Sequence, residues 1–247
     1  MSAAATPDDH RLAATLAKTA GDILMHLRKA AVVEGKPLGA MGDQVANAFL
    51  MSALRTLRPE DGILSEEEAA DASRLAKSRV WIVDPLDGTR EYSEGRSDWA
   101  VHVALAIDGV PAAAAVAQPG LGKVYSTAEP DARSACANRE ILVSRTRPPA
   151  EADRVAAALG GTLQGMGSAG AKTMAVVRGE ALAYVHSGGQ YEWDSCAPAC
   201  VAAAHGLHVS RIDGRPLVYN QADPYMPDLI ICDPSVASAV LKACEPA

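Results

Sequence analysis

Two aspartates, Asp84 and Asp87, follow a short apolar run and lead directly into a Gly-Thr pair at 88–89. The run at 80–83 is long enough for a buried strand. We expect that strand to end at the Asp-Pro step, since proline offers no backbone N–H to a strand ladder. Carboxylates, completed by carbonyls, waters and phosphate oxygens, are the ligands that Mg²⁺ prefers. The stretch therefore predicts a metal site, with the Gly-Thr N–H groups facing a bound anion.

The alternative for this stretch is structural. Asp-Pro and Asp-Gly are ordinary turn dipeptides, and either one alone fits a turn that caps a strand. Here both occur together after one predicted buried strand, which favours the metal site. Carboxylates elsewhere in the chain must decide between the two interpretations.

An acidic triplet follows a second predicted strand. The strand covers 62–65, and Glu66, Glu67 and Glu68 come directly after it. Such a triplet is also typical of a solvated helix start capped by the preceding serine. If the two strands are neighbours, however, Glu66 and Asp84 lie together, and like charges at that distance are costly unless a cation lies between them.

A further carboxylate, Asp43, ends a predicted loop at 35–42 and opens a predicted helix that stops at Pro59. An N-cap role is sufficient reason for an aspartate at this position. A helix start that faces the metal site would also bring Asp43 to Thr89.

Two predicted helices of the second half begin with candidate site residues. A Gly-Ser-Ala-Gly stretch at 167–170 opens the first, on which Lys172 more often lies on a solvated face than binds a ligand. Trp193 and Asp194 begin the second helix, predicted at 195–204. An N-cap role explains Asp194 about as well as metal binding does.

Composition and charge exclude several classes of protein. The formal net charge is −7 over 247 residues, which argues against a general nucleic-acid binder and leaves room for a small anionic substrate held by metals. No apolar run approaches the roughly 18 residues of a membrane span, and the N-terminus lacks a signal-peptide pattern. We expect a cytoplasmic protein with no nucleic-acid or membrane partner, and leave open a homodimer.

The cysteines do not suggest a metal site or a disulfide framework. They are odd in number and include no CxxC pair. One pair is spaced four residues apart, but no further soft ligands have the spacing of a zinc site. Buried free thiols are therefore expected at Cys136, Cys196, Cys200, Cys232 and Cys244.

Helices and hairpins mix along the chain, which predicts a layered α+β fold. Asp108-Gly109 is a strong hairpin signal, and Pro148-Pro149 is the strongest break. We divide the chain there into an N-terminal half, 1–147, with most of the candidate ligands, and a C-terminal half, 148–247, that completes the site. Other expected elements are a helix that begins at Thr6, a second at 152–159, strands at 99–107, 110–117, 124–127, 141–144, 182–185 and 229–232, and two short strands that meet at Asp213-Gly214.

Three of these stretches, in their order and spacing, resemble the signature motifs of the Mg²⁺-dependent, lithium-sensitive inositol monophosphatase superfamily. They are Ser65-Glu66-Glu67, Asp84-Pro85-Leu86-Asp87-Gly88-Thr89 and Trp193-Asp194-Ser195-Cys196-Ala197. Asp43-Gln44 resembles a fourth marker, and Gly167-Ser168 resembles the substrate loop. The resemblance covers nearly the whole chain. It implies a layered α-β-α-β-α sandwich, as in fructose-1,6-bisphosphatases, with the metal site between the halves.

The resemblance also implies roles for individual residues. Two or three Mg²⁺ ions would be held, with Asp84 bridging two of them and a third, weaker ion near Glu66 or Glu67. The implied metal ligands are Glu66, Asp84, the Leu86 carbonyl, Asp87 and Asp194. The implied catalytic residues are Asp43, Glu66 and Thr89, with Thr89 orienting the attacking water. The implied substrate contacts are Gly88, Thr89, Ser168, Lys172 and Asp194.

Residues beside these motifs bear on the substrate. Glu91-Tyr92, Ser144-Arg145 and the stretch 219–233 resemble the branch of the family that acts on 3′-phosphoadenosine 5′-phosphate. The chain departs from the family before Asp43, where Gly-Ala-Met-Gly at 39–42 replaces the usual Thr-x-Ala-Asp. The resemblance thus implies hydrolysis of 3′-phosphoadenosine 5′-phosphate to AMP and phosphate, which removes a by-product of sulfate assimilation. The alternatives are an inositol 1-phosphate or fructose 1,6-bisphosphate phosphatase, and a non-catalytic metal or nucleotide sensor.

Overall fold

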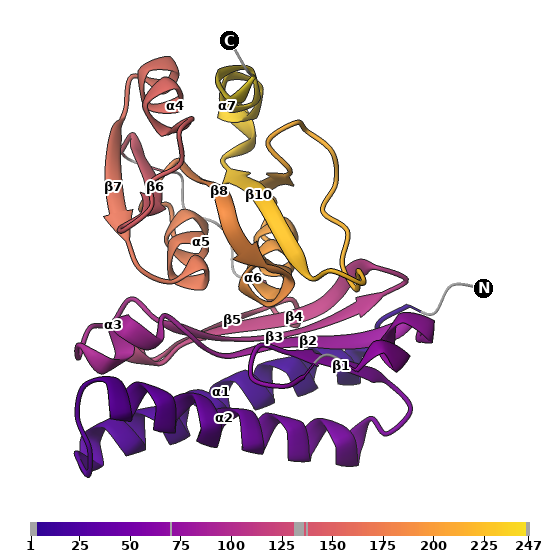
Figure 1. Ribbon diagram of the computed structural model, residues 1–247. Coiled ribbons are helices and arrows are strands. Elements are labelled where there is room, and N and C mark those ends of the chain that lie inside the picture. The colour runs from indigo at the N-terminus through magenta and orange to yellow at the C-terminus, as the bar shows by residue number, and fades with distance from the viewer. Residues whose placement is uncertain (1–3, 70, 131–135, 137, 246–247) are drawn as a thin grey trace.

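The computed structural model describes residues 4–69, 71–130, 136 and 138–245. Its elements stack in five layers, which alternate helices with two five-stranded sheets (Figure 1). Helices α1 and α2 cover the outer face of the first sheet, α5 and α6 lie between the sheets, and α4 and α7 cover the second sheet. The predicted α-β-α-β-α sandwich is confirmed.

Helix α1 (Pro7–Ala30) begins where the sequence predicts. The Thr6 side chain accepts a hydrogen bond from the Asp9 N–H while the Asp9 carboxylate accepts one from the Thr6 N–H. This reciprocal capping satisfies two donors that a helix start leaves free. The apolar stripe of α1 packs on the first sheet together with α2 (Lys36–Leu57).

The loop predicted at 35–42 is wrong, because α2 already begins at Lys36. Asp43 is therefore the eighth residue of the helix and is not an N-cap. The two glycines that suggested a loop serve close packing instead. A Cβ on Gly39 would lie 2.8 Å from Cγ2 of Thr89, and one on Gly42 would lie 3.1 Å from three apolar side chains. These glycines bring α2 against the stretch that follows β2.

The first sheet has the order β1-β2-β3-β4-β5. Strands β1 and β2 are parallel, and the other neighbours are antiparallel. The predicted Asp108-Gly109 turn joins β3 to β4 with positive φ at both residues, as a type I′ turn requires. Both faces of the sheet are buried, against α1 and α2 on one side and α5 and α6 on the other. The strands are β1 (Gly62–Ser65), β2 (Arg79–Asp87), β3 (Ala100–Ile107), β4 (Val110–Gln118) and β5 (Lys123–Ser126).

Strand β2 does not end at the Asp-Pro step, contrary to the prediction. It continues to Asp87 with a bulge, because Asp84 pairs with His102 and Asp87 pairs with Ala100. Two residues of β2 thus oppose one of β3, and Pro85 lies where the ladder is interrupted. A regular strand would put residues three apart on opposite faces. The extra residue puts Asp84 and Asp87 on the same face, toward α5 and α6.

The second sheet has the order β7-β6-β8-β10-β9. Strand β7 was not predicted. The strand predicted after Asp213-Gly214 is wrong, because those residues form no strand in the structure. Strand β5 belongs to the first sheet and β6 to the second. The chain therefore changes sheets before the predicted division at 147/148. That division stays a prediction. The strands are β6 (Glu140–Ser144), β7 (Thr162–Met166), β8 (Ala183–Tyr191), β9 (His208–Ser210) and β10 (Tyr225–Cys232).

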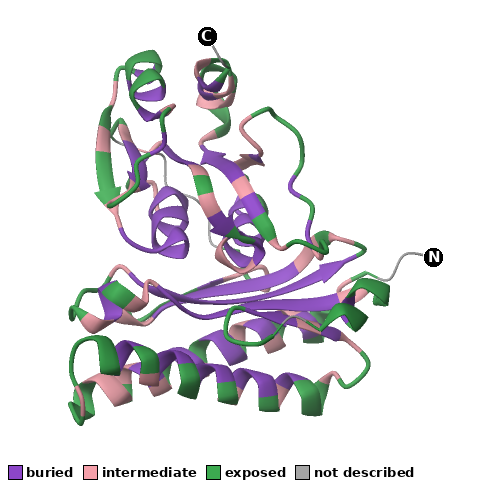
Figure 2. Ribbon diagram, in the orientation of Figure 1, coloured by how far each residue is buried: buried purple, intermediate pink, exposed green. Residues whose placement is uncertain are grey.

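The helices between the sheets are the most buried of the molecule (Figure 2). Every residue of α5 (Ala169–Val177) is buried, and so are most of those of α6 (Glu192–Ala204). The outer helices are α4 (Ala152–Leu159), as predicted, and α7 (Ala237–Cys244); short α3 (Thr89–Ser93) follows β2. The prediction of free cysteines is confirmed, and all except Cys136 are buried. Among the described residues, each helix is too short or too polar to cross a membrane.

The close approach at Gly42 predicts a stability effect. Replacing Gly42 with valine adds atoms where a Cβ alone would already lie 3.1 Å from Leu24, Leu86 and Tyr92. Overpacking of this kind costs about 1–3 kcal/mol, although valine is the better helix former. We expect Gly42→Val to lower the free energy of unfolding in urea by that amount.

The matched control is Ala40→Val, at an exposed position of the same helix. It should cost about 0.5 kcal/mol, from helix propensity alone. A Gly42→Val protein as stable as the wild type would contradict the close packing of α2.

Candidate active site

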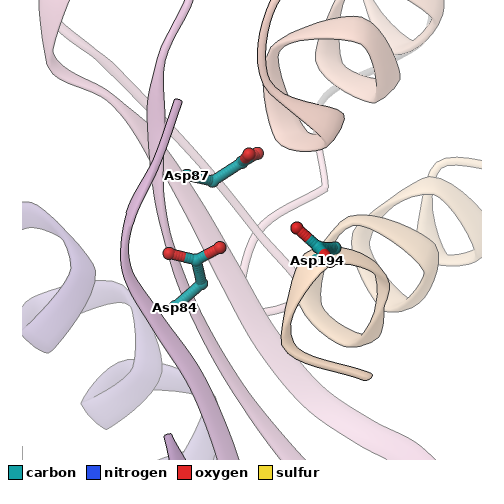
Figure 3. Close-up of side chains that lie close together, drawn as sticks. All are labelled: Asp84, Asp87 and Asp194. Carbon is teal, nitrogen blue, oxygen red and sulfur yellow. The ribbon is translucent and has the colours of Figure 1, made fainter. Parts of the chain in front are cut away.

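Three aspartates converge between the first sheet and the layer of α5 and α6 (Figure 3). Asp84 and Asp87 come from the bulged end of β2, and Asp194 comes from the first turn of α6. One carboxylate oxygen from each lies within 4.8 Å of the other two. The sequence predicted all three as metal ligands, and the structure brings them together.

Asp87 is held by a set of donors. Its Oδ2 accepts hydrogen bonds from the Ser168 hydroxyl (2.5 Å) and the Gly170 N–H (2.7 Å), and it lies 3.1 Å from Nε2 of His102. Burial by itself would raise the pKa of Asp87. The charge of His102 and these hydrogen bonds outweigh burial and lower the pKa to about 2. Asp87 is therefore ionised at every pH relevant to the protein.

Asp84 is in the opposite situation. Its side chain is buried, and its Oδ1 accepts a hydrogen bond from the Leu86 N–H at 3.0 Å. Burial first, and then repulsion from Glu66, Asp87 and Asp194, raise the pKa of Asp84 well above its usual range. A cation beside this carboxylate would favour its ionised form and so oppose both causes.

Asp194 lies inside α6, because that helix begins at Glu192 and not at Ser195 as predicted. It is the third residue of the helix, and its Oδ2 accepts a hydrogen bond from the Tyr191 N–H at 2.7 Å. The other oxygen is left to face the cluster. Burial and the charge of Asp87 raise the pKa of Asp194 to about 6.

Glu66 completes the cluster from β1. Because β1 and β2 are parallel and Ser65 pairs with Val83, the next residue of each strand, Glu66 and Asp84, meet at the same edge. Desolvation, followed by repulsion from Asp194, raises the pKa of Glu66 to about 7, while a hydrogen bond with Asp84 opposes the shift.

The triplet does not begin a helix, which was the structural alternative. Glu68 instead turns back to α2, where it accepts hydrogen bonds from Asn47 (3.1 Å) and Arg55 (2.9 Å). The carboxylate of Glu68 therefore points away from the cluster, whereas that of Glu66 lies beside Asp84.

The expected hydrogen bond between Thr89 and Asp43 is present. The Thr89 hydroxyl lies 3.3 Å from Oδ1 of Asp43 and 3.1 Å from the Leu86 carbonyl. Burial first, then the charge of Glu67, raise the pKa of Asp43 to about 7, against the effect of Thr89. Gly88 precedes Thr89 with φ +93°, and a Cβ there would lie 3.2 Å from Trp99. Only glycine fits this turn without strain.

His102, which was not predicted as a site residue, is fully buried beside Asp87. Its Nε2 faces Asp87, and its Nδ1 lies 3.0 Å from the carbonyl of Trp193, the residue before Asp194. Burial would lower its pKa, but the charge of Asp87 and these contacts raise it. A signal was present: His102 is the single polar residue of an otherwise apolar strand, and it pairs with Asp84 in the register.

Lys172 does not lie on a solvated face, as the sequence suggested. It is buried, and its ammonium donates to the carbonyls of Met166, Gly167 and Ser168 at 2.7–3.4 Å. The ammonium also lies 5.0 Å from the ring centre of Tyr184. Burial lowers its pKa to about 8. In the structure, Lys172 fixes the turn that presents Ser168 to Asp87.

The cluster fits a hard divalent cation. The three aspartates offer oxygen ligands, while the two ring nitrogens of His102 face Asp87 and the Trp193 carbonyl. Oxygen ligands suit Mg²⁺, Mn²⁺ or Ca²⁺ rather than a metal that prefers sulfur. Desolvation first, and then repulsion among the carboxylates, raise the pKa values of Glu66, Asp84 and Asp194. A bound cation relieves this repulsion.

These shifts predict how the stability of the metal-free protein depends on pH. Asp43 and Glu66 have pKa values of about 7 in the folded protein, against about 4 in an unfolded chain. The folded state therefore binds more protons up to pH 7, and stability falls as pH rises through that value. In EDTA, we expect a higher Tm at pH 6.5 than at pH 8, and saturating Mg²⁺ should raise the Tm more at pH 8.

The control is Asp43→Asn, which removes one of the two titrating groups and should reduce the difference. A metal-free protein with equal Tm at the two pH values would contradict the crowding of charge.

Comparison with known proteins agrees with the site. A model of the inositol monophosphatase family matches residues 9–161 and 129–243. The chain is 47% identical to the 3′-phosphoadenosine 5′-phosphate phosphatase of Mycobacterium leprae, over 94% of this chain and 92% of that protein. It is 31% identical to the 3′(2′),5′-bisphosphate nucleotidase CysQ of Escherichia coli K12, over 85% and 94%.

The fold has a counterpart among solved structures. An inositol monophosphatase from Zymomonas mobilis superposes with a TM-score of 0.78 at 23% identity, over 99% of this chain and all of that one. The layered sandwich, the aspartates on β2 and α6, and a sequence match over nearly the whole chain agree with one another. Together they establish that the chain belongs to the inositol monophosphatase family.

Proposed function

We propose that this protein is a Mg²⁺-dependent phosphomonoesterase that hydrolyses 3′-phosphoadenosine 5′-phosphate to AMP and phosphate. The observation that carries the proposal is the cluster of Asp84, Asp87 and Asp194 within 4.8 Å, in a chain 47% identical to a phosphatase of that substrate. Hydrolysis at a metal cluster needs charge neutralisation and positioning, and no nucleophilic side chain.

The metal-holding residues are those that converge. Glu66, Asp84 and the Leu86 carbonyl would hold one Mg²⁺, and Asp84, Asp87 and Asp194 a second. The Leu86 carbonyl lies 3.1 Å from the Thr89 hydroxyl, and since a carbonyl has two lone pairs, one remains for a metal even if Thr89 donates to the other. When bound, paired cations would activate a water and neutralise the leaving oxygen. Asp87, ionised by its donors, supplies a permanent negative charge to this arrangement.

Thr89 and Asp43 take the role of positioning and deprotonating the water. The Thr89 hydroxyl lies within reach of the Asp43 carboxylate and the Leu86 carbonyl. If it donates its one proton to Asp43, its oxygen would accept a hydrogen bond from the attacking water. A pKa of about 7 suits Asp43 to take up a proton near neutral pH. The N–H groups of Gly88 and Thr89, at the start of α3, would hold the phosphate.

Ser168 and Lys172 support the site through other residues. Ser168 donates to Asp87, and Lys172 is occupied by three carbonyls. We propose that they keep Asp87 and the 166–168 turn in place; direct contact with substrate stays a prediction for both.

A phosphate-release panel tests the proposed function. The substrates are 3′-phosphoadenosine 5′-phosphate, inositol 1-phosphate and fructose 1,6-bisphosphate, each with Mg²⁺ and with EDTA. We expect the largest kcat/KM with the nucleotide and no turnover in EDTA. A preference for either sugar phosphate would reassign the substrate. No turnover of any of the three would favour the non-catalytic sensor.

Asp84→Asn should abolish this turnover with the fold intact, because an amide cannot bridge two cations as a carboxylate does. Circular dichroism checks the fold. A folded variant that keeps more than about a tenth of the wild-type rate would remove Asp84 from the bridging role, since losing a shared metal ligand costs much more.

The water-positioning role predicts a separate effect for Thr89. Thr89→Ala should lower kcat by about 10²–10⁴-fold with little change in KM, as for the loss of general base catalysis. Thr89→Ser keeps the hydroxyl and should retain most of the activity. A large rise in KM with kcat preserved would instead make Thr89 a substrate ligand.

A further inference from the structure

A buried cation and a buried anion lie on the two segments that bring Glu66 and Asp194 to the cluster. Arg74 is 2% exposed and belongs to a short 3₁₀ helix, Ala72–Ala76, on the segment that follows Glu66. Glu192 is 1% exposed and is the first residue of α6, two positions before Asp194. The proposed function uses neither charge.

Both charges are compensated by the same two residues, Asn220 and Gln221. Arg74 donates to the Asn220 side-chain carbonyl at 2.6 Å and to the Gln221 main-chain carbonyl at 2.8 Å. The Asn220 amide group donates back to the Arg74 carbonyl at 3.1 Å. On the other side, the two oxygens of Glu192 accept from the N–H groups of Asn220 and Gln221 at 2.6 and 2.7 Å.

The backbone of Asn220 makes this two-sided arrangement possible. Its φ is +59°, in the left-handed region that asparagine tolerates better than most residues. The segment is also anchored by Tyr219, which is fully buried, donates its N–H to the Gly109 carbonyl and donates its hydroxyl to Ser195 in α6. The connection between Arg74 and Glu192 is therefore a fixed part of the fold.

A buried network of this kind contributes little to stability, so its presence suggests another role. Each buried charge loses its hydration, and apolar residues of similar volume often give equal or better stability. What apolar residues do not supply is a directional link with a defined length. Here the link joins the 3₁₀ helix of Arg74, which packs on β1, to the start of α6: a Cβ on Gly62 would lie 3.0 Å from the Cβ of Arg74. Strand β1 ends at Ser65, directly before Glu66.

We propose that Arg74, Asn220 and Glu192 are positioning residues, which set the placement of Glu66 relative to Asp194 and so the affinity of the cluster for divalent cations. This inference rests on the proposed function only in that the cluster binds such cations. Residues that orient metal ligands typically contribute about 10–100-fold to affinity.

Isothermal titration of the metal-free protein with MgCl₂ and MnCl₂, without substrate, tests the proposal. Arg74→Lys removes the planar fork and keeps the charge, and should weaken cation binding by about tenfold or more. Arg211→Lys is the matched control: its guanidinium makes a similar paired contact with Asp228, at 2.7 and 2.6 Å, between segments that carry none of the carboxylates. It should leave the affinity unchanged.

A second pair of variants separates positioning from folding. Asn220→Gly keeps the left-handed backbone, both N–H groups toward Glu192 and the bond from Arg74 to the Gln221 carbonyl, but it loses both side-chain bonds between Asn220 and Arg74. It should therefore weaken cation binding in the same direction as Arg74→Lys. Asn220→Asp keeps an oxygen for Arg74 and should restore most of the affinity. The Tm in EDTA, measured for every variant, reports stability separately from cation affinity. Every variant should remain folded at the temperature of the titration.

Wild-type affinity in Arg74→Lys and Asn220→Gly would overturn the positioning role, and so would an Asn220→Asp protein as impaired as Asn220→Gly. A loss of affinity matched by Arg211→Lys would also overturn it. The proposed function fails separately: the wild type would then bind Mg²⁺ and release no phosphate from any substrate of the panel.

Discussion

Repulsion among carboxylates is the constraint on which the rest of this structure depends. Asp84, Asp87 and Asp194 gather between the first sheet and the layer of α5 and α6, with Asp84 and Asp87 buried, and Glu66 lies beside Asp84 at the exposed edge of this group. Without a cation, desolvation and this repulsion raise the pKa values of three members and so favour their protonated forms. Either protons or a bound cation can relieve the repulsion. Because crowding these carboxylates destabilises the metal-free fold, their arrangement supports a role in binding a cation.

The protein divides the task among the four carboxylates. Asp87 is kept ionised by Ser168, Gly170 and His102, and the remaining members are left without such a set of donors. His102 reaches both Asp87 and the residue before Asp194, so one buried ring connects the two elements that carry the ligands. The helices between the sheets therefore contribute to the site through their first turns, while their remaining length fills the core.

Local sequence signals predicted those features that depend on neighbours along the chain. Glu66 and Asp84 were expected together because two strands end beside them, and the parallel pairing of β1 and β2 confirms it. The helix starts predicted at Thr6 and within 167–170 are also confirmed, as α1 and α5. Composition and spacing are sufficient for such features, since the interactions involved span only a few residues.

The features that were missed all depend on contacts between distant parts of the chain. Gly39 and Gly42 indicated a loop, and only the packing of α2 against the stretch after β2 explains them inside a helix. The bulge in β2 needs its partner strand, and burial of Lys172 needs the second sheet. Asn220 and Arg74 are 146 residues apart, so no local pattern relates them.

The central claim is that Asp84 bridges two cations. Crystals grown with MnCl₂, with diffraction measured at a wavelength where manganese scatters anomalously, test it directly. The account predicts two anomalous peaks, about 3.5–4 Å apart as in other two-metal sites, with an Asp84 oxygen in contact with each and Glu66 and Asp194 on opposite sides. A single peak, or a pair that Asp84 does not bridge, would contradict it.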